Sequence, residues 1–150
     1  MSETQARKTI HDLLRAARAR LERLGAEETL AAQSEGALII DTRSGDERRQ
    51  DGIIPGSLHV PRSVLEWRVD PDAAPEFRNP HVHGLEQRLV LVCAHGESSS
   101  LAAATLQELG FAGATDLEGG FEAWRKAGLP VHPAPDVDLH TIPGLGGPDP

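Results

Sequence analysis

The sequence predicts an α/β fold with a central, mostly parallel sheet, helices on both faces and an additional N-terminal helix. Two apolar runs, at residues 37–41 and 88–93, are typical of strands that are covered on both faces, as in a parallel sheet. Segments with strand patterns alternate with segments with helix patterns, which favours parallel strands joined by helical crossovers. The length of 150 residues fits one domain.

The first expected element is an amphipathic helix over residues 7–24, within an N-terminal region that we assign to residues 1–25. Its apolar side chains recur mostly at spacings of three and four, with arginines and a lysine around them. The apolar positions are Ile10, Leu13, Leu14, Ala17, Leu21 and Leu24. We expect this helix to pack on the surface of the domain itself, and the alternative is a helix that binds a membrane surface or a partner protein.

The first half of the domain begins with a short helix at residues 26–34, which stops near Gly36. The strand at residues 37–41 follows, and Ser44 can cap a polar helix at residues 45–50. A turn then leads to a short strand at residues 58–60, which a proline ends.

The second half begins with a brief turn at residues 64–67 and an irregular stretch at residues 69–87. Prolines and a glycine break any period in that stretch, so we interpret it as a mobile or substrate-covering loop. The remaining expected elements are a strand at 88–93, a helix at 98–109, a strand at 114–117 and a helix at 121–127. The domain is thus assigned to residues 26–131, and the Pro- and Gly-rich residues 132–150 to a flexible tail.

Composition excludes several classes of function. The formal net charge of -8 disfavours nucleic acid as a partner and means that a small anionic substrate would need a local positive pocket. No apolar run is long enough to span a membrane, and the first residues do not resemble a signal peptide, so we expect a cytoplasmic protein. The single cysteine excludes an intramolecular disulfide and a Cys-rich metal site.

That cysteine, Cys93, is the candidate nucleophile. It ends the strongest strand, and the loop from Ala94 to Ser98 leads into the strongest helix. Ligands of open α/β sheets bind beyond the carboxyl ends of the strands, and a loop that opens into a helix directs main-chain N–H groups at one point. Such a setting stabilises a thiolate, and Gly96 supplies the backbone freedom that a tight turn needs. The alternative is an inert, buried cysteine at a strand end.

Five stretches of the sequence resemble, in order, motifs of the rhodanese (thiosulfate sulfurtransferase) homology domain of the single-domain type. They are LIIDTR (38–43), DGIIPGSLHVP (51–61), LVCAHGESS (91–99), LQELGF (106–111) and LEGGFEAWRKAGLPV (117–131). Each motif alone is weak, but all five in the family's order make a specific signal over residues 26–131.

The resemblance implies a sulfurtransferase in which Cys93 carries a sulfane sulfur as a persulfide. The Cys93 thiolate would take sulfur from a small donor such as thiosulfate, or from a protein donor, and pass it to cyanide, a thiol or a protein cysteine. The resemblance also implies that the sulfur is bound by the loop residues Ala94, His95, Gly96, Glu97, Ser98 and Ser99. Neither a metal nor an organic cofactor is needed.

The chain departs from the family in the charge of this loop. Ser98 stands where many members have an arginine, and Glu97 places a negative charge where a dianionic donor would arrive. Partial protonation of His95 could offset that charge. Arg62 and Arg68 are the candidates for supplying the missing positive charge, with Arg62 preferred.

Asp41 and Arg43 close the first central strand near the same edge of the sheet. We expect them either to brace the Cys93 loop or to form a local ion pair.

Two competing functions are considered. Phosphatases of a related fold have a longer loop with an arginine six positions after the cysteine, where this chain has Ser99, so phosphoryl transfer is disfavoured. The second alternative is a sulfur carrier or protein-interaction module that does not turn over, which the N-terminal helix and the tail would suit.

Overall fold

The computed structural model describes residues 6–135, in which four parallel strands form one sheet. The strands are β1 (Leu38–Asp41), β2 (Leu58–His59), β3 (Leu89–Val92) and β4 (Thr115–Asp116). Their order across the sheet is β2-β1-β3-β4, and each neighbouring pair is parallel. This confirms the predicted fold class and places β1 and β3 at the centre.

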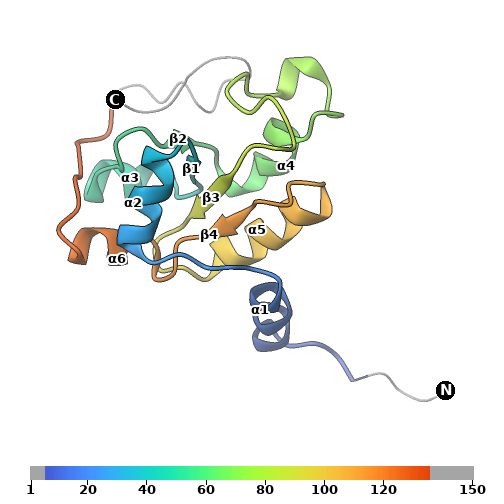
Figure 1. Cartoon of the computed structure of the whole chain (residues 1–150). Coiled ribbons are helices and arrows are strands. Elements are labelled where there is room, and N and C mark those ends of the chain that lie inside the picture. The colour runs from blue at the N-terminus through green and yellow to red at the C-terminus, as the bar shows by residue number, and fades with distance from the viewer. Residues whose placement is uncertain (1–5, 136–150) are drawn as a thin grey trace.

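Helices cover both faces of the sheet, as predicted. The α-helices of the described chain are α1 (Ile10–Ala19), α2 (Ala26–Ser34), α3 (Gly45–Asp51), α4 (Leu65–Val69), α5 (Ser98–Glu108) and α6 (Gly120–Lys126). Two short 3-10 turns lie at Arg62–Val64 and Pro75–Phe77. Figure 1 shows α2, α3 and α6 on one side of the sheet and α4 and α5 on the other.

Alternate residues of the central strands supply two separate cores, because successive side chains of a strand point to opposite faces. Ile40, Leu89 and Leu91 pack with residues of α4 and α5. Ile39 and Val90 pack on the other face with residues of α2 and α6. Burial on both faces explains why the central strands read as continuous apolar runs.

The N-terminal helix is shorter than the expected residues 7–24. It ends at Ala19 with Arg20 as its C-cap, and the chain then extends along the sheet. Leu24 bonds with its N–H to the Asp116 carbonyl at 3.1 Å and accepts from the Glu118 N–H at 2.8 Å. The open edge of β4 therefore offers Leu24 main-chain hydrogen bonds in place of those of a longer helix.

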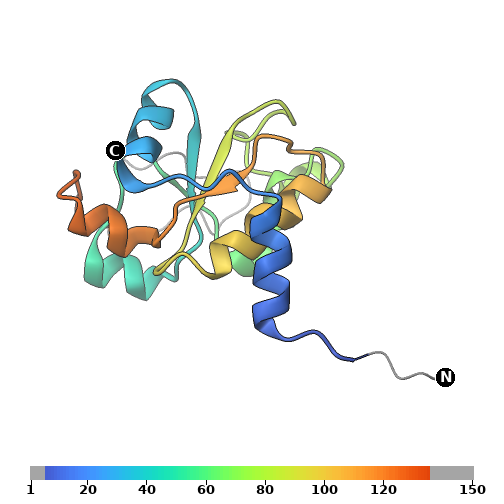
Figure 2. The same cartoon turned by 60° about the horizontal axis from the view of Figure 1, so that its bottom comes forward.

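The expectation that this helix packs on its own domain is confirmed, since α1 lies beside α5 (Figure 2). Ala17 is buried in this contact, whereas Ile10 and Leu13 on the same helix stay exposed.

No helix in the described residues is long and apolar enough to cross a bilayer.

Past α6, the chain returns to the domain at His132, which pairs with Ile53 in an antiparallel bridge. The N–H of Ile53 donates to the His132 carbonyl at 2.8 Å, and the reverse bond is 3.0 Å. The first residue assigned to the flexible tail is thus held by main-chain bonds. Most of that predicted tail, residues 136–150, lies outside the described residues.

Candidate active site

Cys93 lies at the carboxyl end of β3, a central strand, and directly before the loop that leads into α5. Only 7% of the residue is exposed. The predicted strand, cysteine, loop and helix unit is therefore present. In an open α/β sheet this edge is where ligands bind.

The sulfur of Cys93 accepts hydrogen bonds from the main chain of its own loop. The N–H groups of Gly96 and Ser99 lie 3.2 and 3.3 Å from Sγ. Burial raises the pKa of the Cys93 thiol, but hydrogen bonds from the Ser98 and Ser99 side chains and from these two N–H groups outweigh it. The pKa is therefore lowered, and the thiolate is stabilised.

The Ser99 hydroxyl has a second possible acceptor, because its oxygen lies 2.8 Å from Oδ2 of Asp116. A hydroxyl carries one proton, so it donates either to the carboxylate or to the sulfur. The short bond to a buried carboxylate favours Asp116. The main-chain N–H groups of Gly96 and Ser99 are then the constant donors to the sulfur.

The start of α6 packs directly against the loop. The N–H of Phe121 donates to the Cys93 carbonyl at 2.8 Å, and the N–H of Glu122 donates to the Ala94 carbonyl at 3.1 Å. Gly96 has a φ of 82°, and a Cβ there would lie 2.5 Å from the Gly119 nitrogen. Gly96 is therefore required both for its backbone conformation and for this close approach.

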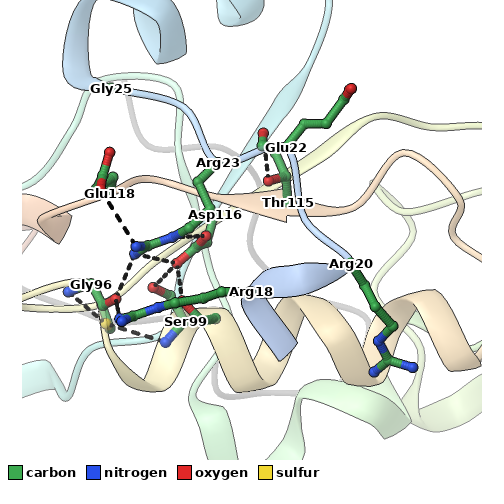
Figure 3. A network of polar contacts seen from close by, with 12 residues as sticks. Arg18, Arg20, Glu22, Arg23, Gly25, Gly96, Ser99, Thr115, Asp116 and Glu118 are labelled. Carbon is green, nitrogen blue, oxygen red and sulfur yellow. Dashed lines mark hydrogen bonds and ion pairs between the residues drawn. The ribbon is translucent and has the colours of Figure 1, made fainter. Parts of the chain in front are cut away.

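Asp116 of β4 is the buried centre of a polar network (Figure 3). Its carboxylate accepts from the hydroxyls of Ser99 and Ser100, each at 2.8 Å, and from Nε and Nη2 of Arg23 at 3.0 and 3.2 Å. A buried carboxylate needs such partners, because an isolated charge is costly to remove from water.

The helix α1 and the extended stretch after it, residues 10–24, form an N-terminal segment. Two arginines of this N-terminal segment reach the Cys93 loop (Figure 3). Nη2 of Arg18 and Nη2 of Arg23 donate to the Gly96 carbonyl at 2.9 and 2.8 Å. Arg18 Nε also donates to Ser100 Oγ at 3.1 Å. Neither residue stands out in the sequence, because arginines beside an apolar stripe are ordinary on an amphipathic helix.

The loop residues His95, Glu97 and Ser98 are exposed, whereas Gly96 and Ser99 are buried. The loop thus presents one imidazole, one carboxylate and one hydroxyl to solvent. Glu97 is the acidic side chain of the loop from Ala94 to Ser99, and it is exposed as a carboxylate facing an incoming anion would have to be.

Asp41 and Arg43 form a buried ion pair, with 2.9 Å between Arg43 Nη2 and Asp41 Oδ2. Arg48 adds a second contact to the same carboxylate at 3.3 Å. The Arg43 guanidinium also lies 3.8 Å from the centre of the Phe121 ring. Phe121 in turn donates its N–H to the Cys93 carbonyl. The ion pair is therefore linked to the active-site loop through contacts with a single residue, Phe121.

Arg62 and Arg68 bond to partners outside the Cys93 loop. Nη1 of Arg62 lies 3.0 Å from the carboxylate of Glu66. Nη1 of Arg68 donates to the Phe77 carbonyl at 3.1 Å. The positive charge that touches the loop comes instead from the N-terminal segment.

Within residues 6–135, no three His, Cys, Asp or Glu side chains are grouped so that they could hold a metal ion. The site itself holds a buried cysteine sulfur that accepts two main-chain hydrogen bonds at the carboxyl edge of the sheet.

Residues 25–127 match the family described as "Rhodanese-like domain". The thiosulfate sulfurtransferase GlpE of Pseudomonas savastanoi is 33% identical over 105 residues, which cover 69% of this chain and 87% of that protein.

Two solved structures extend the comparison. RPA3614 of Rhodopseudomonas palustris, a protein of unknown function described as a possible tyrosine phosphatase, is 35% identical with a TM-score of 0.76, covering 88% of this chain and 99% of its own. The human single-domain sulfurtransferase TSTD1 is 26% identical with a TM-score of 0.57, covering 69% of this chain and 95% of its own.

Proposed function

The chain belongs to the rhodanese-like domain family, and we propose that it is a sulfurtransferase in which Cys93 carries a sulfane sulfur from a donor to a nucleophilic acceptor. The observation that carries this proposal is the hydrogen bonding of the Cys93 sulfur by the N–H groups of Gly96 and Ser99. Hydrogen bonds of this kind lower the pKa of the thiol, and the thiolate is the nucleophilic form of cysteine.

The reaction proceeds in two displacement steps. The Cys93 thiolate attacks the outer sulfur of thiosulfate, the sulfur–sulfur bond of the donor breaks, and sulfite leaves with the electron pair. The enzyme then carries a persulfide anion, which the loop N–H groups stabilise. Cyanide or a thiolate attacks the outer sulfur, the bond to Cys93 breaks, and the free Cys93 thiolate returns.

The exposed face of the loop governs the choice of donor. Glu97 opposes a dianion such as thiosulfate, and a protonated His95 favours it. A protein persulfide brings less negative charge to the loop, so such a donor remains compatible with this surface. Neither step requires a metal or an organic cofactor.

A phosphatase is the second candidate, because the similar protein RPA3614 is described as a possible tyrosine phosphatase. The loop of this chain has no arginine or lysine from Ala94 to Ser99. Ser99 occupies the place of a phosphate-binding arginine and bonds to Asp116 instead. A transferring phosphoryl group would therefore lack its bidentate contact, which favours sulfur transfer.

The test combines intact-mass measurement with turnover. Wild-type protein incubated with thiosulfate should gain the mass of one sulfur atom, lose it to a thiol reductant, and form thiocyanate when cyanide is added. Cys93→Ser should do none of these while keeping its fold, because a hydroxyl cannot form a persulfide. Loading without turnover would favour the non-enzymatic carrier. Hydrolysis of aryl phosphates that is lost in Cys93→Ser would overturn the proposal.

A further inference from the structure

Both the N–H and the carbonyl of Gly96 form hydrogen bonds. Its N–H donates to the Cys93 sulfur, and its carbonyl accepts from Arg18 and Arg23. Peptide groups are planar, so fixing a carbonyl also fixes the N–H at the other end of the same plane, here that of Glu97. Two guanidinium donors on one carbonyl thus hold the centre of the loop in a defined orientation.

The second donor to the sulfur, Ser99, is anchored by the same network. Its hydroxyl bonds to Asp116, and Asp116 is held in turn by Arg23 through two hydrogen bonds. Both residues that donate an N–H to Sγ are therefore tied to the N-terminal segment, one through the Gly96 carbonyl and one through the Asp116 carboxylate.

We propose that Arg18 and Arg23 are positioning residues of the Cys93 site, and that the N-terminal segment is a working part of that site. They hold the loop so that the N–H groups of Gly96 and Ser99 point at the sulfur. Neither arginine touches the sulfur. The consequence for sulfur transfer rests on the proposed function, whereas the consequence for the Cys93 thiol does not.

Charge supports this arrangement. The loop from Ala94 to Ser99 contains no lysine or arginine. Two guanidinium groups from outside the loop nevertheless donate hydrogen bonds to its Gly96 carbonyl. Other charged or titratable groups lie on every element that adjoins the loop. They include His95 and Glu97 in the loop, Asp116 and Glu118 at β4, Glu122, Arg125 and Lys126 on α6, Asp41 at the end of β1 and Arg43 after it.

The test is the pH dependence of Cys93 alkylation by iodoacetamide, followed by intact mass. Arg18→Gln removes one contact to the loop, at the Gly96 carbonyl, and one to Ser100 in the first turn of α5, and leaves the Arg23–Asp116 pair in place. The matched control is Arg20→Gln, since the Arg20 side chain contacts the Ala104 carbonyl and Glu108 of α5, away from the Cys93 loop. Both variants change the net charge equally.

We expect the pKa of Cys93 to rise by about 0.5 to 1 pH unit in Arg18→Gln, as for the loss of one or two hydrogen bonds. Below the pKa, alkylation should slow about three- to tenfold. Arg20→Gln should match the wild type. Arg18→Lys keeps the charge but not the two-pronged geometry, and should restore the pKa only in part.

Equal Cys93 pKa values in Arg18→Gln and the wild type would overturn the proposal. A Cys93 pKa in Arg18→Lys equal to that of the wild type would also overturn it, because charge alone would then explain the effect. Arg23→Gln should raise the pKa of Cys93 further. The melting temperature of this variant shows whether it is folded. If it is not folded, the result for Arg18→Gln decides whether the proposal stands. The readout is independent of sulfur transfer. A wild type that forms no persulfide would refute the proposed function and leave this inference standing.

Discussion

Gly120 approaches Cys93 so closely that a side chain could not fit between them. A Cβ on Gly120 would lie 2.4 Å from the Cys93 carbonyl oxygen and 2.6 Å from the Gly96 nitrogen. Gly120 also has a φ of 65°, a conformation that favours glycine. The helix α6 can therefore begin in contact with the loop, and its residues Phe121 and Glu122 donate their N–H groups to the carbonyls of Cys93 and Ala94.

Gly120→Ala should destabilise the fold and disturb the cysteine loop. Gly128→Ala is the control, because Gly128 has a φ of 75° but no atom within 4 Å of its Cβ position. The control should cost about 1–2 kcal/mol of unfolding free energy from backbone strain alone. Gly120→Ala should cost clearly more, as measured by urea unfolding. Equal costs would mean that the contact with the loop relaxes freely.

The lowered pKa of Cys93 gives stability a defined pH dependence. Because the folded pKa lies below that of the unfolded chain, the thiolate stabilises the fold fully above the ordinary thiol pKa of about 8.5. That contribution is lost as the pH falls through the lowered pKa of the folded protein. The unfolding free energy of the wild type minus that of Cys93→Ser should therefore grow as the pH rises through this window. A difference that shrinks would show that burial dominates and the pKa is raised.

Asp116→Asn should be strongly destabilising, because it leaves Arg23, whose side chain is 15% exposed, without its buried charge partner. Breaking a buried pair typically costs about 3–5 kcal/mol. Glu118→Gln is the control, since Glu118 is 68% exposed and lies 3.7 Å from the same arginine. It should cost below about 1 kcal/mol. Chemical unfolding measures both, and similar costs would show that the carboxylate is not essential to the network.

Glu97→Gln should improve transfer from thiosulfate more than transfer from a persulfide donor of lower charge. Removing one exposed negative charge near a dianion should raise kcat/KM for thiosulfate about two- to fivefold at low salt, and less at high salt. Glu35→Gln removes a charge near the start of β1, at the opposite edge of the sheet, and should change neither donor. An equal gain with both donors would place Glu97 away from the incoming substrate.

Much of the fold could be predicted from the sequence because its signals are local. Residues 37–41 and 88–93 read as buried strands, and the helix expected at 98–109 is α5 (Ser98–Glu108). Cys93 follows from the same pattern, since a strand end, a glycine and a helix start are adjacent in the chain. The rhodanese resemblance added the closing motif at residues 117–131, but the contact of its Gly119 and Gly120 with the Cys93 loop came from the structure.

The tertiary structure alone decided what surrounds the thiol. Residues 20–24 have a helical pattern, but the chain leaves the helix after Ala19, and Leu24 forms main-chain hydrogen bonds with Asp116 and Glu118 beside β4. Arg62 and Arg68 follow the strand expected near the pocket, yet their partners are Glu66 and Phe77. Arg18 and Arg23 are more than 70 residues from Gly96 in sequence, at separations of 78 and 73. A guanidinium reaches a carbonyl at that separation only through folding, and a linear pattern carries no information about which pair will meet.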